Sequence, residues 1–177
     1  MKLSVITRAS PDIHLLEEIN TEAIPECERN SLDDLLDTGA QVCGIYESDE
    51  PVGFIVLRRY KSILYLAYLA VRHDMRSKGI GSKALSQLTE ENAGCRIVVE
   101  YEAPNSSDGS DESDMRSRRK AFYERCGFKS TGWYTFYDDT EFEIACAGLP
   151  FDIDEFNGFV GYLSSLVNDH IPKPYRK

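Results

Sequence analysis

The run from Arg76 to Ser82 combines the features that a phosphate-binding loop needs. It reads Arg-Ser-Lys-Gly-Ile-Gly-Ser, and its glycines at positions 79 and 81 let a backbone approach a ligand closely. An apolar run precedes it and apolar residues at helical spacing follow it, so the glycines lie where a strand passes into a helix. The N–H groups and positive dipole end of a helix start favour anions, and Arg76 and Lys78 add positive charge. The sequence therefore predicts a diphosphate site over residues 76–82.

Cationic residues gather around this loop. Arg72, Arg76, Lys78 and Lys83 fall in one short segment, and Asp74 is the acidic residue that opposes them there. A locally positive patch on an acidic protein is a place where an anion can bind. The formal net charge of the whole chain is -10, which argues against nucleic acid as a general partner, because binding to a phosphate backbone needs clustered cations.

Two carboxylates in a predicted buried strand offer a second chemistry. Glu100 and Glu102 alternate with Tyr101, so in a strand both carboxylates leave one face and Tyr101 leaves the other. Like charges repel, and the more buried carboxylate is expected to have a raised pKa suited to accepting a proton. An alkyl amine is protonated at neutral pH and needs such a base before it can attack a carbonyl. Either glutamate fits, and Glu100 is preferred because it lies deeper in the apolar run.

The glycine loop also satisfies a dinucleotide-binding pattern. Gly79 to Ala84 fits G-x-G-x-x-A, and Glu100 lies near the distance at which that fold places its ribose-binding acid. In that fold the first glycine directly follows the strand, whereas here seven residues separate Val71 from Gly79. The antiparallel strands expected upstream also conflict with a doubly wound parallel sheet. We therefore set this alternative aside.

The elements that must position these groups follow from hydrophobic period and turn residues. Ser10 and Ser31 are expected to cap the first two helices, and the polar run 105–114 is expected to form a surface loop. Residues 42–71 form an antiparallel meander, and the strand after the next helix lies parallel to the last of these strands. The expected strands are 2–8, 42–47, 52–60, 63–71, 95–101, 130–137 and 142–147, and the expected helices begin near residues 11, 31, 80, 115 and 152.

Composition narrows the class of protein. A chain of 177 residues with 42% hydrophobic and 28% charged residues is typical of one globular α/β domain, and no run of about 18 apolar residues predicts a membrane segment. The early charges and Pro11 leave no room for a signal peptide. Five cysteines without a C-x-x-C pair and three scattered histidines favour reduced thiols and no metal site. We expect a cytoplasmic protein.

Two motifs in the same order resemble those of the GNAT N-acetyltransferases. The run Arg76 to Gly81 is similar to that family's Arg/Gln-x-x-Gly-x-Gly/Ala loop, and Phe122 to Phe128 resembles its later Phe-Tyr-x-x-x-Gly-Phe motif. The order of elements also fits over about residues 1–147. The resemblance implies a single GNAT-like domain over residues 1–177, with a C-terminal helical extension at 152–177. It also implies a central mixed, mostly antiparallel sheet with helices on both faces.

The same resemblance implies acetyl-CoA as cosubstrate and assigns roles to residues. The backbone of Leu69, Ala70 and Val71 would pair with the pantetheine arm and supply an N–H to the oxyanion. Tyr123 would protonate the leaving thiolate, and acidic residues on the corresponding strand of some family members support Glu100 or Glu102 as the base. The residues that would hold the pyrophosphate are Arg76, Ser77, Lys78, Gly79, Ile80, Gly81 and Ser82.

The acceptor implied by the family is a small-molecule or peptide amine, and a homodimer is compatible with the resemblance. An acidic first helical region favours a cationic acceptor such as a polyamine, an aminoglycoside or a basic peptide, although a solvated helix face explains the same charges. These charges are Glu17, Glu18, Glu22, Glu26 and Glu28. Two alternatives stay open: an acyl-CoA-binding regulatory module without turnover, and a toxin-like acetyltransferase on charged transfer RNA, which the acidic surface disfavours.

Overall fold

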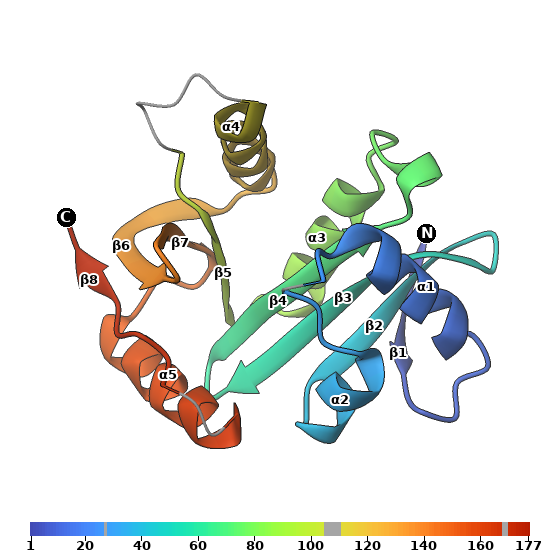
Figure 1. The fold of residues 1–177 in the computed structure, drawn as a ribbon, viewed down its shortest axis with the longest axis horizontal. Helices are drawn as coiled ribbons and strands as arrows, with labels where there is room; N and C mark the ends of the chain where they lie inside the picture. The colour runs from blue at the N-terminus through green and yellow to red at the C-terminus, as the bar shows by residue number, and fades with distance from the viewer. Residues whose placement is uncertain (27, 105–110, 168–169) are drawn as a thin grey trace. The chain divides into compact units, whose positions relative to one another are not determined.

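The computed structural model describes residues 1–26, 28–104, 111–167 and 170–177 (Figure 1). The chain has an α/β fold with a mixed, mostly antiparallel sheet, as the sequence predicts. In chain order its elements are β1 (Lys2–Ile6), α1 (Ile13–Ala23), α2 (Leu32–Asp37), β2 (Gln41–Glu47), β3 (Glu50–Tyr60), β4 (Ile63–Val71), the 3-10 turn η1 (His73–Met75), α3 (Ile80–Glu91), β5 (Arg96–Glu102), α4 (Asp111–Arg125), β6 (Lys129–Tyr137), β7 (Thr140–Gly148), α5 (Ile153–Val167) and β8 (Tyr175–Arg176).

The strands hydrogen-bond in the order β1-β2-β3-β4-β5-β7-β6-β8. β4 and β5 are parallel and pair from Ile63 with Arg96 to Tyr65 with Val98, which confirms the predicted parallel pair. The pairings β1-β2, β2-β3, β5-β7, β6-β7 and β6-β8 are antiparallel. Two compact units divide the chain, and β4 contributes to both. Unit 1 comprises Met1–Arg59 and Leu66–Glu91, and unit 2 comprises Tyr60–Tyr65 and Asn92–Lys177.

In unit 1, helices cover both faces of the strands. On one face α1 and α2 share a buried cluster with β1 to β4, which consists of Ile6, Leu16, Ile19, Leu32, Leu35, Ala40, Val42, Phe54, Val56 and Ala70. Because strand side chains alternate, Cys43, Ile45 and Ile55 leave the other face, and they are buried as well. Figure 1 shows α3 on this face, on the side of the strands away from α1 and α2.

In unit 2, α5 and α4 pack against β5, β6 and β7 from different sides of the strands. The α5 side is a cluster of Ile63, Val98, Ile144, Cys146, Phe156, Phe159 and Val160. On the other side Tyr101 of β5 stacks on Tyr123 of α4, with ring centroids 5.4 Å apart. The C-terminal extension therefore supplies part of the core of unit 2 through α5.

Helix starts agree only in part with the sequence. Ser31 caps α2 as predicted, because its side chain accepts a hydrogen bond from the Asp34 N–H at 3.1 Å. The prediction for the first helix is wrong: α1 begins at Ile13, and the Ser10 hydroxyl instead accepts the N–H of Thr7 at 2.9 Å. Ser10 therefore closes a turn that precedes the helix.

Two boundaries differ in the second half of the chain. Of the predicted loop 105–114, residues 105–110 lie outside the described residues, and α4 already begins at Asp111 rather than at Met115. The short strand β8 was not predicted, and it pairs Trp133 with Arg176 and Tyr134 with Tyr175. Two residues carry too little periodicity for a strand to be recognised before its partner strand is known.

Two further findings concern the described ranges alone. None of the helices there is both long and apolar enough to cross a membrane. Within the same ranges, no group of three or more His, Cys, Asp or Glu side chains is arranged to hold a metal ion.

Candidate functional site

The predicted passage from strand through loop to helix is present in unit 1. β4 ends at Val71, η1 turns the chain, and α3 begins at Ile80. The Lys83 N–H bonds the Gly79 carbonyl at 3.0 Å and marks the first helical hydrogen bond. The N–H groups of the first turn, from Ile80 to Ser82, precede that bond and have no helical acceptor by geometry. They form the anion-binding end of a helix dipole.

Backbone conformation explains why small residues occupy this loop. Ser77 has φ +61° and Gly79 has φ +79°, the left-handed region that glycine adopts without penalty. A Cβ built at Gly79 would have no other heavy atom within 4 Å, so conformation rather than crowding selects glycine there. The Ile80 side chain is 4% exposed and anchors the helix start in the core. The loop backbone stays exposed above that anchor.

The charges around the loop are more balanced than the sequence predicts. Arg72 pairs with Glu50 at 2.6 Å and with Asp74 at 2.7 Å. The Arg76 Nε donates to the Val71 carbonyl at 2.9 Å, and its Nη2 lies 4.0 Å from an oxygen of Glu22. Besides Asp74, which lies within the segment, α1 and β3 bring two distant carboxylates to it, Glu22 and Glu50. Among these cations, Arg76 is less tightly held than Arg72.

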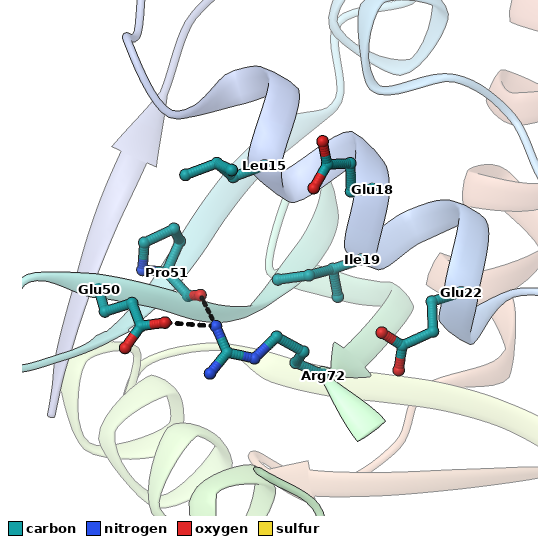
Figure 2. Close-up of a pocket in the computed structure, with 7 residues that line it drawn as sticks. All are labelled: Leu15, Glu18, Ile19, Glu22, Glu50, Pro51 and Arg72. Atoms are coloured by element: carbon teal, nitrogen blue, oxygen red, sulfur yellow. Dashed lines mark hydrogen bonds and ion pairs between the residues drawn. The ribbon is translucent and has the colours of Figure 1, made fainter. Parts of the chain in front are cut away.

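A cavity of about 160 Å³ lies beside α1 in unit 1 and is drawn in Figure 2. α1 presents Glu18 and Glu22 toward it, and Arg72 spans its lower edge with bonds to Glu50 and Pro51. Glu22 also accepts the His73 N–H at 2.5 Å, so α1 is tied directly to the turn that precedes the glycine loop. The cavity is lined by Leu15, Glu18, Ile19, Glu22, Glu50, Pro51 and Arg72.

Part of the acidic first helix has a structural role. Glu17 accepts the N–H of Leu32 at 2.8 Å and the side-chain amide of Asn20 at 3.0 Å. It therefore holds the start of α2 against α1. Glu22 also has contacts within the protein, with His73 and Arg76. Two of the five glutamates, Glu17 and Glu22, are therefore not simply solvated charges. Glu18 lines the cavity beside α1.

In unit 2, Glu100 lies partly buried between two hydroxyl donors. The Tyr65 hydroxyl donates to its Oε2 at 2.9 Å, and the Thr135 hydroxyl donates to its Oε1. Burial raises the pKa of Glu100, and these two hydrogen bonds oppose the rise because they favour the ionised form. A carboxylate with a raised pKa in a strand is a candidate proton acceptor.

Glu102 has a different environment. Its carboxylate lies 3.3 Å from the Arg116 Nε and 3.5 Å from Arg119 Nη1, both on α4. The predicted repulsion between the two glutamates is therefore not the cause of the raised pKa of Glu100, which is burial. These arginines lie in the middle of α4, because the helix begins at Asp111, and Lys120 on the same helix also has a partner on the sheet: it pairs with the buried Glu143 at 2.8 Å.

Tyr123 lies in an aromatic layer of unit 2. It is 9% exposed, its ring stacks nearly parallel to that of Tyr101 at an angle of 9°, and Phe122 and Phe128 meet it edge-on. Burial raises the pKa of Tyr123 to about 12, so its hydroxyl is protonated at neutral pH. A protonated hydroxyl can donate a proton to a leaving thiolate.

The spacing of the second motif is that of a helix C-cap. Gly127 has φ +89°, its N–H bonds the Glu124 carbonyl at 3.0 Å, and the Phe128 N–H bonds the Tyr123 carbonyl at 3.1 Å. These two bonds form a Schellman motif, which turns the chain back on the helix. The turn brings the Phe128 ring to 5.5 Å from the ring of Tyr123. Glycine is required there because a side chain disfavours the left-handed conformation.

Three hydroxyl groups near Glu100 were missed by sequence reasoning. Tyr65, Thr135 and Tyr137 lie on β4 and β6, and strand pairing through β5 and β7 brings the first two to the carboxylate. Burial and the nearby Glu100 charge raise the pKa of Tyr137, which stays protonated. Thr135 is fully buried, but this burial became visible only in the structure, because the sequence of β6 has no clear alternation of apolar and polar residues.

Comparison with known proteins identifies the class. The family described as "Acetyltransferase (GNAT) domain" matches residues 38–130, more than half of the chain. A GNAT-family protein from Bacteroides thetaiotaomicron is similar in structure with a TM-score of 0.74 and 24% identity, over 94% of this chain and 98% of that one. A search of curated proteins gives no significant match.

Two further solved structures share the fold. The aminoglycoside 6'-N-acetyltransferase of Enterococcus faecium aligns with a TM-score of 0.65 and 19% identity, over 86% of this chain and 99% of that one. A GNAT family acetyltransferase of Elizabethkingia anophelis, solved with acetyl-CoA bound, aligns with a TM-score of 0.59 and 16% identity, over 84% and 97%. These likenesses show a common α/β fold, and the family match over residues 38–130 defines the class of protein. The chain belongs to the GNAT family of acetyltransferases.

Proposed function

We propose that this protein transfers the acetyl group of acetyl-CoA to a primary amine by direct attack in a ternary complex. The observation that carries the proposal is the segment from β4 to α3, which lies within the GNAT match and exposes the N–H groups of a helix start behind Gly79. Such groups suit the diphosphate of coenzyme A. We treat residues 1–177 as one GNAT domain, with 152–177 as its C-terminal extension.

The cosubstrate is held by backbone more than by side chains. Leu69, Ala70 and Val71 end β4, and their main chain pairs with the pantetheine arm. Ser77 to Ser82 give the diphosphate their N–H groups, while Arg76 and Lys78 contribute charge. Arg76 is better suited than Arg72 to bind an anion, since the Glu22 carboxylate beside it is 4.0 Å away, whereas the carboxylates paired with Arg72 are within 2.7 Å.

Glu100 accepts the proton of the amine. Burial raises the pKa of Glu100 toward the working pH, and proton transfer is most effective when the pKa of the base lies near that pH. Glu102 is the second candidate, but two arginines already neutralise its carboxylate. Proton transfer to Glu100 leaves a neutral amine that attacks the thioester carbonyl.

The remaining steps fall to the β4 backbone and Tyr123. A main-chain N–H at the end of β4 stabilises the oxyanion, which on the general scale of such donors contributes roughly 3 to 4 kcal/mol. Collapse of the intermediate releases the coenzyme A thiolate, and Tyr123 supplies the proton. Its pKa of about 12 keeps the hydroxyl protonated at neutral pH, so that its proton is available for transfer when the thiolate forms.

The acceptor we infer is cationic. Glu18 faces the cavity beside α1, and the surrounding helix is acidic, which favours an ammonium-bearing small molecule or a basic peptide. The fold is shared with an aminoglycoside 6'-N-acetyltransferase, a protein named for a polycationic acceptor. Equal turnover of neutral and cationic amines of similar size would contradict this part of the proposal.

The decisive experiment has two arms. Calorimetric titration with acetyl-CoA tests binding, and release of the coenzyme A thiol over a panel of amines tests transfer. We expect heat of binding and thiol release with at least one cationic amine. Binding without release on any amine would support the alternative, a regulatory module that holds acyl-CoA, and absence of binding would refute both.

A further inference from the structure

From the described part of the chain, the Glu100 carboxylate receives one side-chain hydrogen bond on each oxygen. The Tyr65 O–H donates to Oε2 at 2.9 Å, and the Thr135 O–H donates to Oε1. Each carboxylate oxygen has two lone-pair sites, so each keeps one site for a proton or a substrate. The two donors thereby fix the plane of the carboxylate, and the carboxylate can still accept a proton.

Strand register and packing hold both donors in place. Tyr65 pairs with Val98 two residues before Glu100 on β5, and its ring lies 4.9 Å from that of Phe159. Thr135 is fully buried on β6 and pairs with Phe142 of β7. Donors on strands and against a helix have little freedom to turn away, so they are preorganised for the carboxylate.

We infer that Tyr65 and Thr135 are positioning residues that keep the Glu100 carboxylate ionised and oriented for proton transfer. This inference rests on the proposed function, in which Glu100 accepts the amine proton. In that step an N–H bond of the ammonium breaks, an O–H bond forms on Glu100, and the amine keeps its electron pair. The hydroxyl donors favour the carboxylate over its protonated form and therefore set the pH range in which Glu100 can accept a proton.

The other groups around Glu100 do not replace these donors. Tyr137 on β6 is a titratable group nearby, and its raised pKa keeps it neutral. The register neighbour on β7 is Ile144, and the α5 side chain against Tyr65 is Phe159, neither of which titrates. Glu102 on β5 is engaged by Arg116 and Arg119 of α4.

The direct test measures the pKa of Glu100 in the ligand-free protein. NMR of carbon-13-labelled glutamate carboxyls is followed over pH, with Glu100→Gln identifying the signal. Tyr65→Phe and Thr135→Val should each raise that pKa by about one pH unit, since each removes a donor to the ionised form. Thr135→Ser, which keeps the hydroxyl, should restore it. Tyr65→Phe retains the ring packed on Phe159, so it decides the matter even if Thr135→Val fails to fold.

Matched controls separate positioning from general damage. Thr131→Val removes a hydroxyl on the same strand that bonds the Ile144 carbonyl at 2.8 Å, and Tyr162→Phe removes one from α5. Neither should move the pKa of Glu100. An unchanged pKa of Glu100 in Tyr65→Phe, or equal movement in the controls, would overturn the inference.

Turnover tests the link to catalysis. If an amine is acetylated, the acidic limb of the pH profile of kcat/KM should move to higher pH in Tyr65→Phe, with activity recovered there. A uniform loss of activity at every pH would indicate a merely structural role and overturn the inference. If no amine is acetylated, the proposed function fails, whereas the NMR titration still decides whether the two hydroxyls hold the carboxylate ionised.

Discussion

The contact between Glu22 and Arg76 allows a prediction with a defined sign. An oxygen of Glu22 lies 4.0 Å from the Arg76 Nη2, and the two side chains are 41% and 46% exposed. Two unit charges at this distance interact by about 1 kcal/mol in water-like surroundings, and exposed pairs often contribute less. Removing the Glu22 charge should therefore free Arg76 for the diphosphate and lower the Kd for acetyl-CoA by about two- to fivefold.

Glu22→Gln is the suitable change because it removes charge and little else. The Gln side-chain oxygen can still accept the His73 N–H that Glu22 now accepts at 2.5 Å. The gain should shrink as salt is added, since screening already weakens a surface pair. The gain in affinity should vanish in the Arg76→Ala background, because the Arg76 guanidinium that Glu22 holds is then absent.

Calorimetric titration at low and at physiological ionic strength measures the effect. Glu18→Gln is the matched control, because Glu18 lies on the same helix and lines the same cavity. Looser binding in Glu22→Gln would refute the reasoning. An equal gain in Glu18→Gln would show that general charge, and not the contact with Arg76, explains the effect.

Three further outcomes follow from the assigned roles. Gly81→Leu should raise the Kd for acetyl-CoA at least tenfold by blocking backbone approach, measured by the same titration, with an unaltered melting temperature as the folding check. Glu100→Gln should lower kcat by about 10²- to 10⁴-fold with the Kd for acetyl-CoA retained. A larger loss of kcat in Glu102→Gln would make Glu102, and not Glu100, the base. Gly127→Ala should destabilise the fold by about 1 to 2 kcal/mol through its φ of +89°, a fall of several degrees in Tm that Gly94→Ala should not reproduce.

The raised pKa of Glu100 also has a consequence for folding stability. Between the ordinary pKa of a glutamate and the raised pKa of Glu100 in the folded protein, the folded state binds more protons than the unfolded state. The contribution of Glu100 to folding stability is therefore complete below the ordinary pKa, and it is lost as pH rises through the folded pKa. Glu100→Gln should therefore flatten the decline of stability with rising pH, which denaturant unfolding at several pH values measures. A steeper decline in the variant would contradict the assigned cause.

Local sequence pattern predicted most of the fold. The strands at residues 42–47, 52–60 and 63–71 agree with β2, β3 and β4 to within two residues, because apolar period and turn residues are local properties. The start of α3 at Ile80 was predicted by the change of period beside the glycines. The predicted cap at Ser10 was wrong, because the Ser10 hydroxyl accepts the N–H of Thr7 and α1 begins only at Ile13.

The sequence by itself determined the class of protein. The glycine loop lies between a strand and a helix, and the Phe-Tyr motif ends in a glycine cap, because backbone conformation at these points depends on neighbouring residues alone. The partners of the charged groups were decided only by tertiary structure. Glu22 meets Arg76, and Tyr65 and Thr135 meet Glu100, through pairings between segments far apart in the chain. Charge balance and pKa depend on distances that no local pattern contains, so these partners became visible only once the sheet and its helices were assembled.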